Sequence, residues 1–413
     1  MTTRINNWRP ILSNGLKRRA QQAIGEIVDQ LSALGLKSSD VSLSGGKAGI
    51  ALLFGYLSLS GHTSHKKLAT QFLQTATNVL EEAHMRPDLY SGFAGIAWAC
   101  SHLEKELGVR IVDFAEVDLA LEKYLSKTPW RADYDLISGL VGYGVYALER
   151  LDQPAARRCL KNVIDRLDET AEKRGDEITW FTAPHLLPEW QRKEHPKGYY
   201  NLGLAHGVPG VIVLLAHADS AGVQRRKSKK LLRGAVNWLL RRKSLARVGS
   251  CFSSRIGPDL KETPTRCAWC YGDPGVASAL FLAARLCREK DWEKEALEIA
   301  LHASEQKGDE SGVKDAGICH GAAGLAHIFN RFFQATNKVE FKNAAQYWFE
   351  RTLQYKRPDT GIAGYLAYEP KLNGQVAWKK EAGVLTGAAG IALVLLAACS
   401  NVEPQWDRML LIS

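Results

Sequence analysis

Residues 385–398, LTGAAGIALVLLAA, are the last of seven similar stretches in a chain of 413 residues. In every stretch a G-x-x-G pair leads directly into an apolar run. One such pair is common by chance, but seven copies in the same context indicate an internal repeat. The first glycines of the pairs are Gly46, Gly92, Gly139, Gly207, Gly272, Gly321 and Gly387.

The spacing and composition of the repeats predict the fold. Successive first glycines lie 46, 47, 68, 65, 49 and 66 residues apart, and the shorter intervals are long enough for two helices. The run after each pair is apolar nearly all round, as in a buried helix, whereas the charged segments between pairs have one apolar stripe, as in a surface helix. We predict an all-α fold, an (α/α)7 toroid of seven inner and seven outer helices forming one domain over residues 1–413. An open superhelix would have the same local pattern.

The glycines and the longer intervals support local predictions. The first glycine of each pair is predicted to permit a tight turn or a positive φ, and the second to let neighbouring helices approach closely. The three longer intervals contain loop-like segments, which are predicted to form short hairpins at one end of the barrel. One hairpin turn is predicted at Asn373-Gly374.

The charge of the chain is concentrated in one segment. Lys and Arg outnumber Asp and Glu by 54 to 44, which gives a net charge of +10 and suggests nucleic-acid binding. However, residues 221–250 contain ten Lys or Arg and no acidic residue, which equals the whole excess. We therefore predict no nucleic-acid partner. The segment is either the solvated face of an outer helix or a basic helix that contacts an acidic leader peptide, a partner enzyme or an anionic membrane surface.

The location of the protein is predicted from what the sequence lacks. The N-terminal residues show no signal-peptide pattern, and no apolar run reaches the length of a membrane span. We expect a cytoplasmic protein, with membrane association through residues 221–250 left open. The eight cysteines are then reduced, so clustered cysteines are candidates for metal binding or catalysis.

Aligning the seven repeats places reactive side chains immediately before the first glycine. His206 and His320 directly precede that glycine in the fourth and sixth copies, and Cys270 and Cys319 lie two positions before it in the fifth and sixth. If the repeats close into a ring, these positions gather at one mouth of the barrel. Two thiolates and an imidazole are natural zinc ligands and leave a fourth position open. We predict a site of this kind, with a packed core as the alternative.

Cys267 adds a second interpretation, because Cys267-Ala-Trp-Cys270 is a C-x-x-C motif. With Cys319 and His320 it would make a closed, four-ligand structural zinc site. A thioredoxin-like redox motif lacks the βαβ context that it requires. The register of the repeats disfavours Cys267, since it lies three residues further out in the loop.

Other polar residues near the motifs have simpler explanations. Asp88 is predicted to cap a turn. His217 and His327 lie in apolar runs and are predicted to be core histidines. His185 and His195 lie in a long interval, where solvated surface is expected.

The motifs resemble the LanC-type lanthionine synthetase family, which makes lanthipeptide thioethers. The resemblance covers essentially the whole chain, and its most specific matches are YNLGLAHGVPG, RCAWCYGDPGV and ICHGAAGLAHI. It implies an α/α toroid that binds one zinc ion per chain. The implied zinc ligands are Cys270, Cys319 and His320.

The resemblance also implies catalytic residues. His206 in the A-H-G motif matches the catalytic histidine of the family, and Arg266 matches the arginine before W-C-Y-G. Trp269 and Tyr271 match the aromatic residues that flank the first ligand. Asp135 matches an acidic residue before the third motif, although a turn cap is its alternative role.

The implied reaction is intramolecular addition of cysteine thiols to dehydroalanine or dehydrobutyrine in a precursor peptide. Zinc lowers the thiol pKa, a cation or protonated histidine stabilises the enolate, and His206 is the expected acid and base. A dehydratase and a transporter are left open as further partners. Two alternatives remain: addition of glutathione to dehydroamino acids in proteins, and a non-catalytic zinc scaffold or adaptor.

Overall fold

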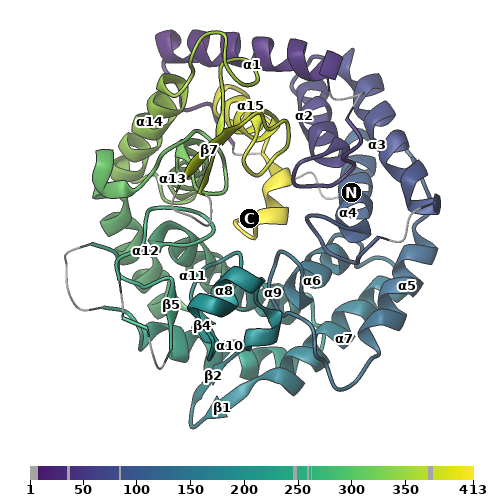
Figure 1. Ribbon diagram of the computed structural model, residues 1–413, viewed down its shortest axis with the longest axis vertical. Helices are drawn as coiled ribbons and strands as arrows, with labels where there is room; N and C mark the ends of the chain where they lie inside the picture. The colour runs from purple at the N-terminus through teal and green to yellow at the C-terminus, as the bar shows by residue number, and fades with distance from the viewer. Residues whose placement is uncertain are drawn as a thin grey trace. The chain divides into compact units, whose positions relative to one another are not determined.

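The computed structural model describes residues 8–34, 38–82, 85–244, 249–257, 260–261, 263–370 and 375–413. The chain divides into two compact units. Unit 1 comprises Met1–Met85, Gly95–Val112 and Val313–Asp407, and unit 2 comprises Arg86–Ala94, Asp113–Gly312 and Arg408–Ser413. The helices and strands of both units are labelled in Figure 1.

Unit 1 consists of helices that alternate between fully buried and half-buried. Its elements are α1 (Asn14–Leu34), α2 (Lys47–Leu59), α3 (His65–Glu82), most of α4 (Phe93–Leu107), α13 (Ala322–Thr336), α14 (Val339–Gln354), strands β6 (Ala367–Pro370) and β7 (Val376–Lys379), and α15 (Ala388–Cys399). Helix α15 packs against α13, α2 and α1, while α3 covers α2 and α14 covers α13. Every residue of α15 is buried, whereas α1 buries one stripe, as predicted for inner and outer helices.

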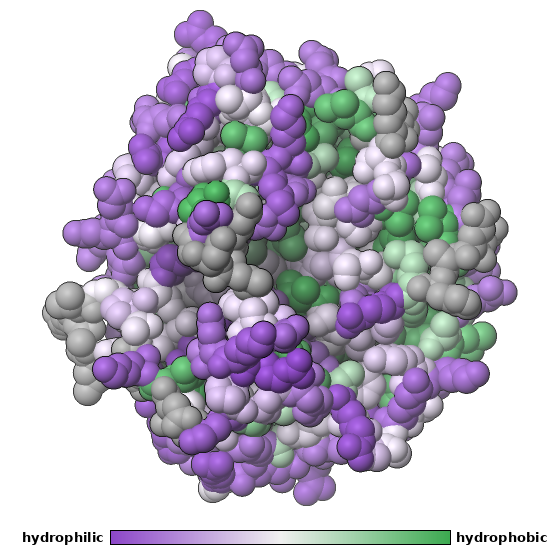
Figure 2. Space-filling model, viewed as in Figure 1, coloured by the Kyte–Doolittle hydropathy of each residue, from purple (hydrophilic) through white to green (hydrophobic). Residues whose placement is uncertain are grey.

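Unit 2 repeats this arrangement. Its helices are α5 (Ala115–Leu125), α6 (Leu140–Glu149), α7 (Pro154–Thr170), α8 (Glu189–Glu194), α9 (Val208–Ser220), α10 (Arg225–Leu240), α11 (Asp273–Cys287) and α12 (Lys290–Glu305), with the short 3₁₀ helices η2 (Pro184–Leu186) and η3 (Gly308–Ser311). Helix α9 packs between α6 and α11, and α7, α10 and α12 cover these three from outside. A further 3₁₀ helix, η4 (Gln405–Leu410), spans the boundary between the units. Hydrophilic residues cover most of the face shown in Figure 2.

The longer intervals contain the short strands that the turn residues predict. In unit 2, β1 (Glu172–Arg174) pairs with β2 (Glu177–Thr179), and β3 (Phe181–Thr182), β4 (Tyr199–Asn201) and β5 (Arg255–Ile256) form an antiparallel sheet. In unit 1, β6 pairs with β7. The predicted turn at Asn373-Gly374 lies outside the described residues.

The glycine pairs permit tight turns, as predicted, but a positive φ occurs at one of the capping glycines rather than at all of them. Of the first glycines that cap inner helices, Gly272 has a positive φ, 128°, whereas the others have extended backbone, for example −105° at Gly387. A Cβ at the first glycine would collide with the backbone six residues earlier, as Gly207 would with the carbonyl of Asn201. The nearest obstacle to the second glycine is also the carbonyl of its own loop rather than a neighbouring helix. The pair therefore lets each loop wrap tightly around the start of its helix.

Candidate functional site

In unit 2 the functional side chains gather at the start of α9. His206 directly precedes this helix, and its Nδ1 lies 2.7 Å from Oδ2 of Asp135. Since a carboxylate only accepts, Nδ1 is the donor and Nε2 is left for chemistry. The other oxygen of Asp135 accepts the backbone N–H of Ser138 at 2.8 Å. Asp135 therefore caps its turn and orients His206 at the same time.

The surroundings of His206 favour its protonated form. Burial lowers the pKa of His206, but the hydrogen bond that it donates to Asp135 and the negative charges of Asp135, Cys270 and Asp133 raise it, and the net pKa lies above the ordinary value. The side chain is 37% exposed, so an external molecule can reach it. A histidine that carries a proton and is open to solvent is suited to general acid catalysis.

Asp133 is a member of this cluster that the sequence reasoning missed. Burial and then the nearby charge of Asp135 raise the pKa of its carboxyl group. The repeat register contained a signal for it, because every copy has a polar residue six positions before the first glycine. These residues are Asp40, Arg86, Asp133, Asn201, Arg266, Asp315 and Glu381.

Tyr271 lies against His206. Their rings stack with centroids 5.6 Å apart and an interplanar angle of 19°. The phenolic oxygen accepts a hydrogen bond from Nδ2 of Asn201 at 3.0 Å, and the guanidinium carbon of Arg255 lies 5.8 Å from the centroid of the Tyr271 ring. The sequence predicted Tyr271 but neither of the two residues that hold it.

Trp269 and Arg266 lie in less reactive surroundings than the sequence suggested. Trp269 is 1% exposed, and its indole N–H donates to the carbonyl of Leu410 at 2.9 Å, so the side chain packs and ties down the C-terminal residues. Arg266 is half-buried, and its Cβ lies beside Gly312. Within the part of the chain that the structure describes, its guanidinium forms no ion pair.

Cys267 has a partner of its own. Its Sγ donates to Oε1 of Gln306 at 2.9 Å. Burial, followed by the charge of Asp273, raises the pKa of the Cys267 thiol to about 12. The Cys267 thiol thus has a hydrogen-bond partner that requires no metal, and its absence from the zinc ligands stays a prediction.

In unit 1, Cys319 and His320 precede α13. The N–H of Cys319 donates to the carbonyl of Leu385 at 2.8 Å, and Nε2 of His320 lies 3.4 Å from the carbonyl oxygen of Tyr368 in β6. A carbonyl only accepts, so Nε2 is the donor in this contact. Both side chains are partly exposed.

The buried carboxylate of Asp315 holds this arrangement in place. Asp315 is 1% exposed. Its Oδ2 accepts the N–H of Tyr368 at 2.9 Å, and its Oδ1 accepts the N–H of Gly317 at 3.1 Å. One residue, Tyr368, thus links Asp315 to the imidazole of His320. This is the usual outer-shell arrangement around a metal-binding histidine.

The donor chemistry fits a zinc ion. In unit 1, Cys319 and His320 offer one thiolate and one imidazole, and in unit 2 Cys270 offers a second thiolate; all three are ligand types that zinc prefers. Cys270 is 4% exposed. Because Nε2 of His320 faces the carbonyl of Tyr368, Nδ1 is the ring nitrogen that could ligate a metal.

A second group of possible ligands lies within unit 2 and was not predicted. Candidate donor atoms of Cys251, Asp273 and His302 lie within 4.8 Å of one another. Asp273 accepts the N–H of Cys251 at 2.6 Å, and Nε2 of His302 contacts the carbonyl of Gly249 at 2.6 Å. Since these hydrogen bonds already tie the loop to α11 and α12, the group has a structural role without a metal.

The remaining histidine and aspartate predictions are mostly correct. His327 is buried and contacts Asp407 at 2.7 Å, and Ser91 donates to Asp88 in a turn. His185 is exposed. The prediction for His195 was wrong, since its side chain is 15% exposed and Nε2 accepts a hydrogen bond from Arg255 at 3.0 Å.

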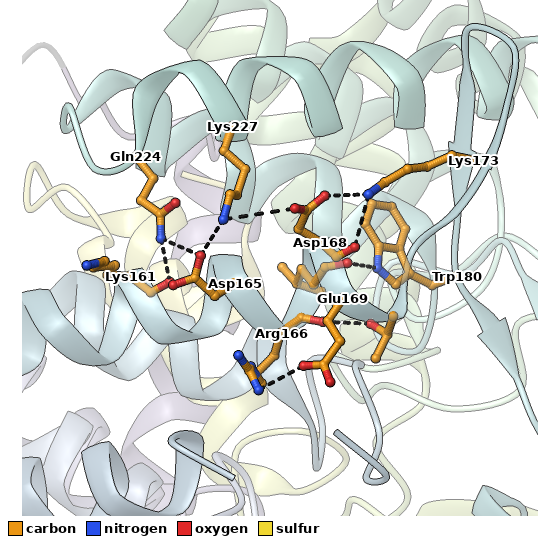
Figure 3. A network of polar contacts seen from close by, with 11 residues as sticks. Lys161, Asp165, Arg166, Asp168, Glu169, Lys173, Trp180, Gln224 and Lys227 are labelled. Atoms are coloured by element: carbon orange, nitrogen blue, oxygen red, sulfur yellow. Dashed lines mark hydrogen bonds and ion pairs between the residues drawn. The ribbon is translucent and has the colours of Figure 1, made fainter. Parts of the chain in front are cut away.

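Helix α10 carries much of the basic segment 221–250, and most of the segment's cations are paired with acidic residues. Figure 3 shows Lys227 between Asp165 and Asp168, with Gln224 and Lys173 bound to the same two carboxylates. The other paired cations are Arg225, Arg233, Arg241, Arg242 and Lys243. Residues 245–248 of the segment lie outside the described residues.

Most of the segment is therefore a charged face satisfied within unit 2. Three of its cations are exposed without an ion pair to any residue that the structure describes: Arg226, Lys229 and Lys230. Among the helices described, none combines the length and apolarity that crossing a bilayer requires.

Comparison with known proteins agrees with this description. The family model described as lanthionine synthetase C-like protein matches residues 37–411. Nisin biosynthesis protein NisC of Lactococcus lactis subsp. lactis is 27% identical over 327 residues, which cover 73% of this chain and 76% of that protein. Glutathione S-transferase LANCL1 of Danio rerio is 24% identical over 390 residues, which cover 86% and 90% respectively.

A solved structure shows the same fold. Nisin cyclase matches with a TM-score of 0.75 at 21% identity, over 97% of this chain and 98% of that one. Its fold is an α,α-toroid. The predicted fold class is therefore confirmed.

Proposed function

Because the chain belongs to the lanthionine synthetase C-like family, we propose that it is a zinc-dependent cyclase acting as a single domain. It adds cysteine thiols of a dehydrated precursor peptide to dehydroalanine or dehydrobutyrine and so forms lanthionine or methyllanthionine rings. The observation that carries this proposal is the proton-bearing pair of His206 and Asp135 close enough to Cys270 for its charge to raise the pKa of His206.

The proposed zinc ligands are Cys270, Cys319 and His320. Their two thiolates and one imidazole leave one coordination position for the substrate. A bound zinc ion supplies a lowered thiol pKa, so that the substrate cysteine is a thiolate at neutral pH. His320 would bind through Nδ1, since Nε2 faces the carbonyl of Tyr368.

The residues of unit 2 perform the proton transfers. When the thiolate attacks Cβ, a C–S bond forms and the π electrons of the C=C bond move to the acyl oxygen, which becomes an enolate. The reaction ends when a proton reaches Cα. Nε2 of His206 is the donor, while Asp135 stabilises the imidazolium through Nδ1. The proton lost by the thiol balances the one gained by Cα, so substrate and product have the same mass.

The experiment uses the purified chain and a dehydrated precursor peptide. Metal analysis should find about one zinc ion per chain, and Cys270→Ala or His320→Ala should lose it. Incubation with the peptide should consume free thiols, measured by alkylation and mass spectrometry, with no other change in mass. Persistence of free thiols with zinc-loaded protein across several dehydrated peptides would contradict the proposal.

Addition of glutathione is the second candidate function, favoured by the similarity to a glutathione S-transferase over 86% of the chain. Here glutathione replaces the peptide cysteine as the thiol. The same incubation with glutathione distinguishes the two reactions, because the peptide would gain the mass of one glutathione and keep its own free thiols. If His206→Ala still bound its partners and no turnover were found for the native chain, a zinc scaffold would be the better description.

A further inference from the structure

Two residues that lie opposite each other on neighbouring strands both contact Tyr271. Asn201 in β4 and Arg255 in β5 are directly paired in the antiparallel ladder. Asn201 contacts the hydroxyl of Tyr271, and Arg255 lies over its ring. The opposing pair therefore acts on one phenol, whose ring also stacks on His206.

The contact with Asn201 determines where the phenolic proton can go. Asn201 is 2% exposed, and its Oδ1 accepts the N–H of Gly203 at 2.9 Å. The amide group therefore cannot turn over without losing that bond, and Nδ2 must donate to Tyr271. The hydroxyl of Tyr271 is an acceptor in this contact, so its own proton points elsewhere. No acceptor for that proton occurs among the residues that the structure describes.

Arg255 makes the phenol a stronger donor and holds its ring in place. Its guanidinium carbon lies 4.9 Å from the ring centroid of Tyr199 and 5.8 Å from that of Tyr271. Its Nη1 donates to His195 at 3.0 Å, which fixes the plane of the guanidinium. A cation over an aromatic ring draws electron density from it and strengthens the O–H donor.

We propose that Asn201 and Arg255 are positioning residues that fix Tyr271 as a hydrogen-bond donor to the acyl oxygen of the dehydroamino acid. This inference rests on the proposed function. As the C–S bond forms, negative charge develops on the acyl oxygen, and a donor already in place stabilises it without reorganisation. Tyr271 keeps its proton throughout, and His206 delivers the proton to Cα, so the step needs no further reactant.

Four variants test the inference in the zinc-loaded chain. Tyr271→Phe removes the donor and should lower kcat about 100-fold with little change in KM. Asn201→Asp keeps the acceptor for the N–H of Gly203 but cannot donate to Tyr271. The phenolic O–H would then donate to the new carboxylate instead of the substrate, so kcat should fall as much as in Tyr271→Phe. Arg255→Met should lower kcat about tenfold, and Arg255→Lys should recover part of it.

The matched control is Tyr200→Phe. Tyr200 is the neighbour of Asn201 in β4, and its hydroxyl donates to Glu172 at 2.8 Å, away from Tyr271. This variant should cyclise at the rate of the native chain. Zinc content and thermal midpoint, measured for every variant, identify any that fails to fold.

A double variant distinguishes positioning from a separate contribution. If Asn201 acts through Tyr271, Asn201→Asp combined with Tyr271→Phe should be no slower than Tyr271→Phe alone. Losses that multiply, or an Asn201→Asp variant with native kcat, would overturn the inference while the proposed cyclase activity stands. A native chain that consumes no peptide thiols would refute the proposed function, and the inference with it.

Discussion

The substitution Asp315→Asn should weaken zinc binding without touching a ligand. The buried carboxylate accepts two backbone N–H groups, from Gly317 and Tyr368, and the carbonyl of Tyr368 faces Nε2 of His320. An asparagine has one acceptor oxygen, so its amide N–H₂ must face one of the two donors. The loss of one charge-assisted hydrogen bond costs about 1.5–3 kcal/mol of stabilising free energy.

Only part of this free energy affects zinc binding, because Asp315 acts on His320 indirectly, through the backbone of Tyr368. Changes in residues that orient a ligating histidine typically lower metal affinity about 10–100-fold, and we expect the dissociation constant of zinc to rise within this range. The assay is competition with a chromophoric chelator at fixed pH, which needs no substrate.

Asp359→Asn is the control for this prediction, since Asp359 is an exposed carboxylate of the same unit. It should leave zinc affinity unchanged. A dissociation constant for Asp315→Asn within twofold of the native value, in a chain of unchanged thermal midpoint, would refute the link from Asp315 through Tyr368 to His320.

Three further predictions concern the acid–base pair, the core of unit 1 and the basic helix. Asp135→Asn removes the charge that raises the pKa of His206, so kcat should fall about 10–100-fold and the alkaline limit of the pH–rate profile should move to lower pH. Asp407→Asn removes the buried carboxylate that pairs with Arg331 and should lower the free energy of unfolding by about 3–5 kcal/mol in urea titrations at pH 7. Because nearby Arg331 and His327 outweigh the effect of burial and depress the pKa of Asp407, this stabilisation is present above about pH 4 and is lost as the pH falls further; the native chain should therefore lose stability more steeply in acid than the variant. Replacing three exposed cations with Gln should weaken binding of an acidic leader peptide at low salt and leave zinc content unchanged; equal affinity in a fluorescence titration would exclude this surface. The three are Arg226, Lys229 and Lys230.

The parts of the fold and site that depend on local pattern were predictable. The glycine pairs and apolar runs located the inner helices, and the register of the repeats singled out His206, Cys270 and Cys319. The register could not separate Asp135 from Asp88, because both lie four residues before a first glycine and both accept hydrogen bonds in their turns. What separates them is the contact of Asp135 with His206, which joins distant parts of the sequence.

The residues around Tyr271 were not predictable in the same way. Asn201 shares a register position with six other polar residues of different types, so position alone did not indicate its role. Arg255 lies in a two-residue strand, which is too short to show an alternating hydrophobic pattern. Its pairing with β4 is a contact between distant parts of the sequence and could not be predicted from such a pattern. The role of the glycines was predicted only in part, because a requirement for glycine does not reveal whether a positive φ or a nearby carbonyl imposes it.

The inner helices begin with the same local arrangement of glycines and backbone carbonyls. The glycines fit against carbonyls of the same repeat, as Gly390 does against Val384, so the geometry of a helix start owes little to how the preceding interval is built. Intervals as different as 46 and 68 residues can therefore lead into the same type of helix start. Strand β6 in one of the longer intervals contacts His320 through the carbonyl of Tyr368, so such an interval can change in length and sequence only where its contacts with the residues at the helix starts are kept.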